Sequence, residues 1–410
     1  MNKENFCWLC IEPYVQITFR KNRVLFYNTL NNKILIYDDV SSRLRVSRSL
    51  SKQANGYVIK LTQKELKSPG IRSFVRDLRK NFMGDLIESS WSDVKPVNIL
   101  PYPVIREPKP GTPFKMEEVL FEATLHLSYC NTGICKKYQA AYNQFVFPVF
   151  KYVKTKKLNW DFVKQILSET GSHNNLTLNI LGAGIQDYLK FNELCSLLGI
   201  RDHRKRYYFF PDFELKEWKS NWKNTIFIFL LTPPFNPSAI QQIQKDILHL
   251  NEQIAVEWDF IVQDPQELEE AGKVALELGL KDFFYRPFYN GLNKTFFLEY
   301  IFITEEDILQ SHPDQRQIFA RKLINETSNG KLTILPDGSV YANVNEPWLG
   351  NIGNSSLQEM VKNELKHGNS WNRVRSSVTP CKQCLYQLLC PPISNYELVL
   401  KKFNLCHIIK

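Results

Sequence analysis

Four cysteines near the end of the chain are the residues with the clearest chemical potential. Cys381 and Cys384 form a CxxC pair, and Cys390 and Cys406 follow them. Four thiolates can close a tetrahedral zinc site or hold a four-iron, four-sulfur cluster. Four unrelated reduced cysteines are the plain alternative, but the clustering is dense for a chain with nine cysteines, so we expect a metal. The spacing alone leaves iron–sulfur and zinc open.

The other five cysteines carry weaker signals. Cys7 and Cys10 also have metal-ligand spacing, but no second pair lies near them, and their role is left open. Cys195 lies on the apolar side of an expected helix and is predicted to be a core residue. The N-terminus has no apolar segment of signal-peptide length, so we expect a cytoplasmic protein whose cysteines stay reduced.

The middle of the chain has the elements that could position a site. Short apolar segments alternate with amphipathic ones from about residue 118 to 300, which predicts a parallel sheet, either doubly wound or a partial barrel. Sites in such sheets form where the strands end. The expected strands are 119–127, 176–181, 206–210, 226–231, 254–262 and 282–286, and the clearest helices are 159–169, 187–198 and 264–279.

Two smaller regions precede this part of the chain. Residues 1–92 are expected to form a small module of antiparallel strands and helices. Residues 93–117 are rich in proline and are expected to be a linker. Specific expectations are strands at 14–19, 24–27 and 34–37, a helix over 71–87, a hairpin at 332–341 and a helix at 357–364.

The C-terminal region resembles the SPASM extension of radical-SAM peptide maturases. The resemblance rests on the hairpin at 332–341, on the segment LGNIG at 349–353 and on the run PCKQC followed by Cys390. That extension usually carries two auxiliary four-iron clusters. Asn343 and Ser394 stand here where the family has cysteines, so the resemblance implies that one cluster is lost. It also implies that Cys381, Cys384, Cys390 and Cys406 hold the other.

The resemblance extends to the middle region, but not to the residues that cut S-adenosylmethionine. A catalytic member has CxxxCxxC after the first strand, whereas this chain has Cys130, then Cys135 one residue too far, then Tyr138. After the next strand, the family's Gly-Gly-Glu is replaced by Gly182-Ala-Gly184. These five residues are expected to form a degenerate cofactor site that does not cleave S-adenosylmethionine.

The chain as a whole is therefore similar to pseudo-radical-SAM proteins of the GG-Bacteroidales peptide natural-product type. The fold implied is α/β: a partial (β/α)6 TIM-like barrel of radical-SAM type at 118–310, with a small N-terminal α+β winged-helix-like module and a C-terminal Cys-rich SPASM-like extension at 325–410.

Residues 1–92 resemble the PqqD-like module that recognises leader peptides. Such a module can bind an extended peptide as an added strand, with pockets that select side chains. An ordinary winged-helix-like domain without a peptide is the alternative. The candidate peptide-binding residues are Lys33, Ile34, Leu35, Ile36 and Tyr37 on one strand and Arg72, Arg76 and Arg79 on the helix.

Composition sets limits on partners. Hydrophobic residues make up 43% of 410 residues, which suits a soluble core, and no apolar run approaches the roughly 18 residues of a membrane span. The net charge of +10 allows a nucleic-acid partner, but the basic clusters lie in separate regions, as is typical of solvated surface.

Three functions follow from these signals. The first is a non-catalytic accessory protein that binds a precursor peptide, a peptide-maturation enzyme or both, and that keeps one 4Fe-4S cluster (or zinc). The second is an enzyme that uses the retained cluster or another site of the barrel. The third is nucleic-acid binding, which would weaken steeply with salt.

Overall fold

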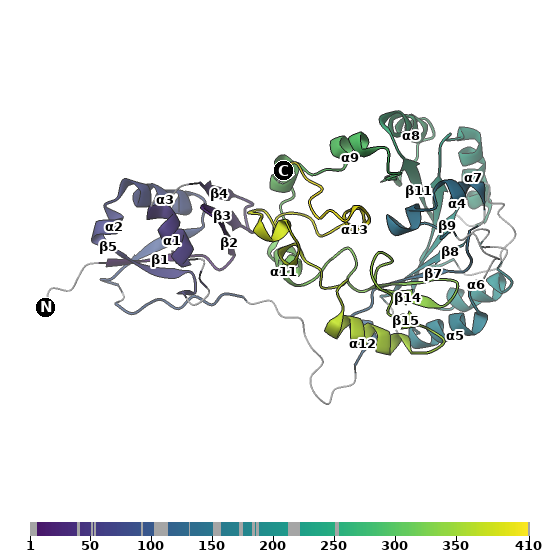
Figure 1. The fold of residues 1–410 in the computed structure, drawn as a ribbon, viewed down its shortest axis with the longest axis horizontal. Coiled ribbons are helices and arrows are strands. Elements are labelled where there is room, and N and C mark those ends of the chain that lie inside the picture. The colour runs from purple at the N-terminus through teal and green to yellow at the C-terminus, as the bar shows by residue number, and fades with distance from the viewer. Residues whose placement is uncertain are drawn as a thin grey trace.

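The protein is described here from a computed structural model of mixed α/β architecture (Figure 1). The described residues are 6–408 except 39–41, 51, 53–54, 92, 102–113, 131, 151–156, 172–174, 183–184, 186–187, 212–221 and 251–253. Most of the expected proline-rich linker lies outside them. Within the described residues, no helix is both long enough and apolar enough to span a bilayer.

The N-terminal module contains two antiparallel sheets, each with three strands. One has the order β2-β3-β4, as expected, and the other has the order β5-β1-β6. Their shared core includes Leu9, Phe26 and Phe74. The elements are β1 (Phe6–Ile11), β2 (Val15–Arg20), β3 (Arg23–Asn28), β4 (Ile34–Tyr37), α1 (Ser42–Leu50), β5 (Val58–Thr62), α2 (Gln63–Leu66), α3 (Pro69–Lys80) and β6 (Gly84–Glu88).

The helix expected over 71–87 is shorter, and its second half was predicted wrongly. α3 ends at Lys80, and residues 84–88 form β6, which pairs with β1. Between them Phe82 takes a left-handed backbone conformation with φ 54°, and its side chain is 72% exposed. The apolar spacing that suggested one long helix face arises from a helix and a strand that follow one another.

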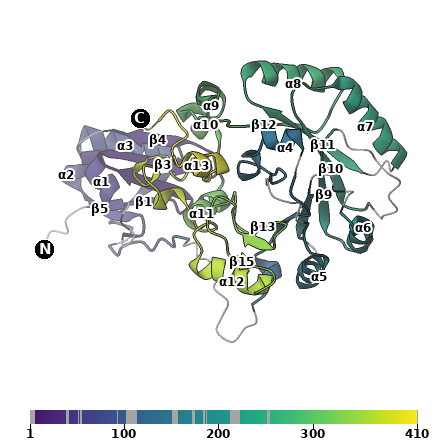
Figure 2. The same cartoon turned by 45° about the vertical axis from the view of Figure 1, so that its right-hand side comes forward.

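The central sheet confirms the predicted parallel arrangement. Six strands, β7 to β12, are parallel and lie side by side in chain order, which excludes the doubly wound alternative. Helices α5 to α8 cover its outer face (Figure 2). The strands are β7 (Glu122–His126), β8 (Thr177–Leu181), β9 (Arg204–Phe209), β10 (Thr225–Leu231), β11 (Ala255–Val262) and β12 (Phe283–Pro287). The helices up to β12 are α4 (Gly133–Lys137), α5 (Trp160–Glu169), α6 (Phe191–Gly199), α7 (Pro237–Leu250) and α8 (Pro265–Glu277).

Helix α8 forms within the range expected for it and has a capping residue at each end. The Asp264 side chain accepts a hydrogen bond from the Glu267 amide, and Pro265 occupies the first turn. Gly279 follows the helix with φ 59°, a conformation that glycine adopts without strain.

The expected hairpin forms and extends the sheet. β13 (Lys331–Ile334) and β14 (Ser339–Tyr341) are antiparallel, and β13 also pairs in parallel with β7. With β15 (Gly350–Asn351) the sheet has nine strands. The remaining helices are α9 (Lys294–Tyr300), α10 (Glu305–Gln310), α11 (Gln315–Leu323), α12 (Leu357–His367) and α13 (Asn395–Leu400).

Alternate residues of the strands face two different interiors. On β9, Tyr207 and Phe209 belong to the large core under the outer helices, whereas Tyr208 belongs to a separate inner cluster. Because side chains alternate along a strand, Arg206 lies on the same inner face as Tyr208. The concave side of the sheet is therefore a distinct environment from the helix-covered side.

Candidate metal centre, sheet mouth and peptide edge

The four cysteines predicted as ligands line one small pocket in the tail. Cys381 begins a single 3-10 turn, Cys381–Gln383, and Cys384 ends it. Cys390 lies just before two prolines. Cys406 forms an isolated β-bridge with Ile303, in which the Ile303 amide donates to the Leu405 carbonyl at 3.0 Å. Three separate segments of the tail thus bring their thiols to the same place.

A buried ion pair connects those segments. The Arg375 and Glu397 side chains are 6% and 3% exposed, and Arg375 Nη1 lies 2.9 Å from Glu397 Oε1. Arg375 Nη1 also lies 3.4 Å from the Cys381 sulfur. Arg375 further donates to three carbonyls, those of Pro391, Pro392 and Phe403. Removing one partner of such a pair would leave an uncompensated buried charge.

The donor set fits a metal or cluster with thiolate ligands. Burial raises the pKa of the Cys390 thiol to about 12 and also raises the pKa of Cys381 and Cys384, while Arg375 opposes the increase in all three. The thiols of Cys381, Cys384 and Cys390 are therefore protonated at neutral pH, and metal binding would release their protons. Within the described residues, no three His, Cys, Asp or Glu side chains are already arranged as metal ligands, so binding would have to draw the thiols together.

The two positions where the resemblance implies lost ligands have polar roles. Asn343 donates from Nδ2 to Asn395 Oδ1 at 2.8 Å. Ser394 caps α13, where its side chain and that of Glu397 form a capping box. Asn343 thus joins the segment after the hairpin to the tail, whereas Ser394 stabilises the start of α13.

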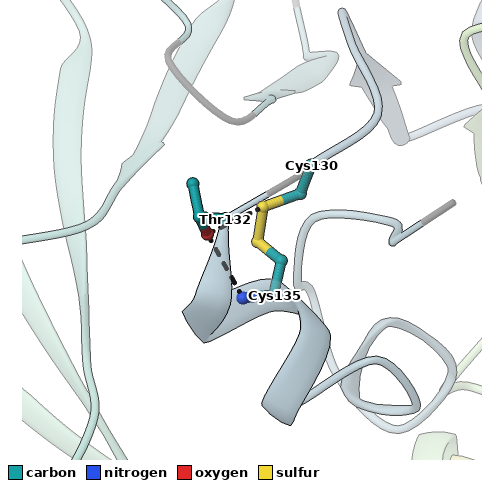
Figure 3. The surroundings of a disulfide bond; sticks show 3 residues. All are labelled: Cys130, Thr132 and Cys135. Atoms are coloured by element: carbon teal, nitrogen blue, oxygen red, sulfur yellow. Dashed lines mark hydrogen bonds between the residues drawn. A yellow bond between two sulfur atoms is a disulfide. The ribbon is translucent and has the colours of Figure 1, made fainter. Parts of the chain in front are cut away.

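The residues after β7 differ from the expectation of free thiols. Cys130 and Cys135 are joined in a disulfide with a Cα–Cα distance of 5.9 Å (Figure 3). Thr132 lies between them: its hydroxyl accepts from the Cys135 amide at 3.3 Å and lies 3.4 Å from the Cys130 sulfur. The start of α4 turns the chain back, so the two buried sulfurs meet. The expectation that all cysteines stay reduced was wrong at this pair.

An apolar cluster fills the mouth of the sheet, the end at which the parallel strands finish. Tyr138, where the resemblance implies a third thiolate, is 1% exposed, and its ring centroid lies 5.2 Å from that of Phe288. The Tyr138 hydroxyl accepts a hydrogen bond from Gln263 at 3.3 Å. The buried members are Cys130, Cys135, Tyr138, Ala141, Phe147, Leu181, Tyr208, Phe210, Ile226, Ile228, Leu230, Ile261 and Phe288.

Of the two glycines predicted for the degenerate cofactor site, only Gly182 is among the described residues. A Cβ added to Gly182 would lie 2.8 Å from the Ser128 hydroxyl, so glycine permits the close approach of the chain after β8 to the chain after β7. Gly184 lies outside the described residues. Of the five residues predicted at this site, the structure brings Cys130, Cys135 and Tyr138 into one cluster.

The predicted peptide edge is the outer strand of the sheet β2-β3-β4. β4 pairs with β3, and its other edge forms no strand pairing within the described residues. Both faces of β4 are packed: Leu35 and Tyr37 lie on the module's own core, and Ile34 and Ile36 lie on a cluster with the tail. Lys33 is exposed just before the strand. The edge, rather than a face, is the part of β4 available for a partner.

The three arginines predicted beside this edge have different surroundings. Arg79 forms an ion pair with Asp85. Arg72 donates to the Lys67 carbonyl at 3.1 Å, and Arg76 donates to the Ser73 hydroxyl at 3.2 Å. The helix lies against β4, since the Tyr37 hydroxyl donates to Asp77 on α3 at 3.1 Å. Arg72 and Arg76 keep exposed cationic groups on α3, whereas Arg79 has an exposed ion-pair partner in Asp85.

The remaining cysteines do not form a further site. Cys7 and Cys10 lie on β1, three residues apart, and their side chains therefore point to opposite faces of the strand. Cys195 is buried in the outer core, as predicted. Arg375 and Glu397, by contrast, were missed by the sequence analysis, because an arginine and a glutamate in polar segments carry no local signal of burial.

Three comparisons relate the chain to known proteins. No protein-family model matches the chain. No curated protein matches it either. Among solved structures, it is similar to Streptococcus suis SuiB bound to precursor peptide SuiA, with 14% identity, a TM-score of 0.45, and coverage of 98% of this chain and 100% of that chain. It is also similar to anSMEcpe with bound AdoMet, with 15% identity, a TM-score of 0.45, and coverage of 66% of this chain and 84% of that chain.

Proposed function

We propose that the chain is a non-catalytic accessory protein of cytoplasmic peptide maturation, of the pseudo-radical-SAM kind with a degenerate SPASM extension. It binds a ribosomally made precursor peptide, a maturation enzyme or both, and it holds one 4Fe-4S cluster in its tail. The observation that carries the proposal is the filled mouth of the sheet. There a disulfide and Tyr138 stand in place of three free thiolates, and apolar side chains occupy the surrounding space.

The tail cluster has a structural role in this proposal. Cys381, Cys384, Cys390 and Cys406 would hold it, and when bound it would cross-link the segments that carry them. Arg375 lies beside Cys381 and would offset part of the negative charge of the thiolates. Leu385, Tyr386 and Leu389, between the second and third ligands, pack against the N-terminal module. A cluster here would therefore brace the surface on which the peptide edge rests.

Metal analysis tests this proposal. The full chain is purified without oxygen and reconstituted, and iron, sulfide and zinc are measured per chain. We expect about four irons and four sulfides. The variant Cys384→Ala should lose them, whereas Cys195→Ala, which removes a buried thiol from the outer core, should keep them. Cleavage of S-adenosylmethionine under reducing conditions should be absent in all three proteins.

The other outcomes separate the parts of the proposal. About eight irons, or turnover of S-adenosylmethionine, would mean that a second cluster is built and would overturn the non-catalytic role. About one zinc would make the tail a zinc knot, with the accessory role unchanged. Equal iron in Cys384→Ala and Cys195→Ala would rule out the tail as the site.

A further inference from the structure

A cavity of about 380 Å³ lies on the concave side of the central sheet. Its walls come from the inner faces of five strands, β7, β9, β11, β12 and β13, and from the chain around Tyr142–Phe147. Phe147 and Tyr208 belong both to this wall and to the apolar cluster of the mouth, so the cavity lies directly beneath that cluster. Unlike the mouth, it is lined by charged groups.

The charged groups of the wall do not balance. Arg286 pairs with Asp259 at 2.9 Å, and Lys331 lies 3.6 Å from Glu122. Arg206, the third cation, forms no ion pair within the described residues, and its buried Nε has no hydrogen-bond partner there. The wall thus has three cations and two carboxylates, a surplus of one positive charge, and Asp259 interacts electrostatically with both Arg286 and Arg206.

Two further buried groups in the wall lack partners within the described residues. His126 is 3% exposed, and its Nδ1 has no hydrogen-bond partner. Asp259 is 2% exposed, and its Oδ1 has no partner, although Oδ2 receives Arg286. A buried polar group without a partner costs free energy comparable to a lost hydrogen bond. The cavity therefore offers a cation, an imidazole and a carboxylate oxygen to a ligand.

We propose that this cavity binds a small α-hydroxy or α-amino carboxylate. The guanidinium of Arg206 pairs with the carboxylate of the ligand, a match of planar donor and acceptor groups. Asp259 accepts a hydrogen bond from the hydroxyl or amino group, and His126 supplies a hydrogen bond to the polar end. The volume is at the lower end of the range for small-molecule pockets and suits a compact ligand. The inference is independent of the tail metal and of peptide binding.

Isothermal titration of the full chain tests the site with named probes. Lactate and L-alanine are titrated alongside their uncharged counterparts, methyl lactate and L-alaninamide. We expect binding of at least one carboxylate, and at least about tenfold weaker binding of its uncharged counterpart. The variant Arg206→Gln should bind the carboxylate about tenfold more weakly or worse, whereas Arg204→Gln should bind it as the unaltered chain does. Arg204 starts the same strand but is exposed and outside the cavity wall.

The proposal does not depend on the stability of one variant. If Arg206→Gln fails to fold, the comparison of carboxylate with ester or amide on the unaltered chain still decides it. A second measurement on the unaltered chain is the His126 ring resonance, which should shift on adding the carboxylate. No binding of either carboxylate, or equal binding of the charged and uncharged probes, would overturn it. So would equal affinities in Arg206→Gln and Arg204→Gln.

Discussion

At the scale of single residues, Glu364 shows how one buried carboxylate can hold a chain reversal. It is 4% exposed near the end of α12, and one of its oxygens accepts from the amides of Ser370 and Trp371 at 3.0 and 2.9 Å. A Cβ on Gly368 would lie 2.0 Å from the carboxylate, so only glycine leaves it room. Burial raises the pKa of Glu364, although the two amides partly oppose this.

That pKa shift predicts a pH-dependent effect of Glu364→Gln. Glutamine keeps an oxygen for the two amides but has no charge. Because the pKa of Glu364 is raised in the folded state, its ionised form reduces stability above the unfolded pKa of about 4.3. We therefore expect the variant to gain stability over the unaltered chain as pH rises from about 4 to 7, and to show no such gain at lower pH. Denaturant unfolding at several pH values checks this.

The control for this prediction is Glu359→Gln, an exposed position in the first turn of the same helix. It should show no comparable gain with pH. A Glu364→Gln variant that is less stable than the unaltered chain at every pH would contradict the argument and would mean that the second oxygen is needed as an acceptor.

The roles of single residues could be predicted only where their spacing in the sequence forms a recognisable pattern. The CxxC pair and its two following cysteines are visible as a pattern, and their four thiols do line one pocket. The Cys130–Cys135 disulfide was not predicted, because partner choice depends on the turn at Thr132. The place of Arg206 in the cavity wall was not predicted either, because the alternation along β9 rather than its basic neighbours in sequence decides where it points.

At the scale of elements, periodicity predicted the central sheet well. All six parallel strands fall within or beside their expected ranges. Five of them are largely buried, whereas β12, the last strand of the sheet, exposes Phe284 and Tyr285. The hairpin was also predicted, but its pairing with β7 was not. Such a pairing joins segments that are far apart in sequence, and local pattern contains no information about it. The same limit applies to β6 and its pairing with β1.

The outer edge of β4 gives a prediction for peptide binding. A precursor peptide that adds as a strand beside α3 would lie near Lys33, Arg72 and Arg76, and acidic peptide residues would be attracted to them. The double variant Lys33→Glu, Arg76→Glu should weaken binding of the labelled precursor at least about tenfold in fluorescence anisotropy. Amide exchange on β4 should slow when the peptide binds.

A control variant with a similar change of charge distinguishes binding at the β4 edge from a general effect of the net charge of the module. Lys60→Glu with Lys64→Glu alters β5 and α2 of the same module, away from the β4 edge, and should weaken binding much less. Equal losses in the two double variants, or unchanged exchange on β4, would contradict strand addition.

At the scale of the whole molecule, the N-terminal module is docked on the tail (Figures 1 and 2). Leu25 and Tyr27 of β3 share a buried cluster with Leu385 and Leu389. The Tyr27 hydroxyl donates to the Pro313 carbonyl at 2.8 Å, and Lys322 donates to Gln16 at 2.7 Å.

Neighbouring residues of β3 allow this docking to be tested. Leu25 faces the tail, whereas Val24 faces the module's own core. Both Leu25→Ala and Val24→Ala should lower stability, with about 2 to 5 kcal/mol expected for the leucine. Only Leu25→Ala should release the module and raise the radius of gyration in small-angle scattering. The same radius for both variants would show that the docking does not depend on this cluster.

The contact between module and tail also has a consequence for the order of synthesis. Arg20 donates to the Lys382 carbonyl at 3.1 Å, across a separation of 362 residues. A ribosome adds roughly 5 to 20 residues each second, so the apolar face of β3 and β4 waits roughly 20 to 70 s for the segment that covers it. During that time Leu25, Tyr27, Ile34 and Ile36 form an uncovered surface that a chaperone can shield and a neighbouring nascent chain can bind. The yield of folded protein in the cell is thus tied to how quickly the tail is translated.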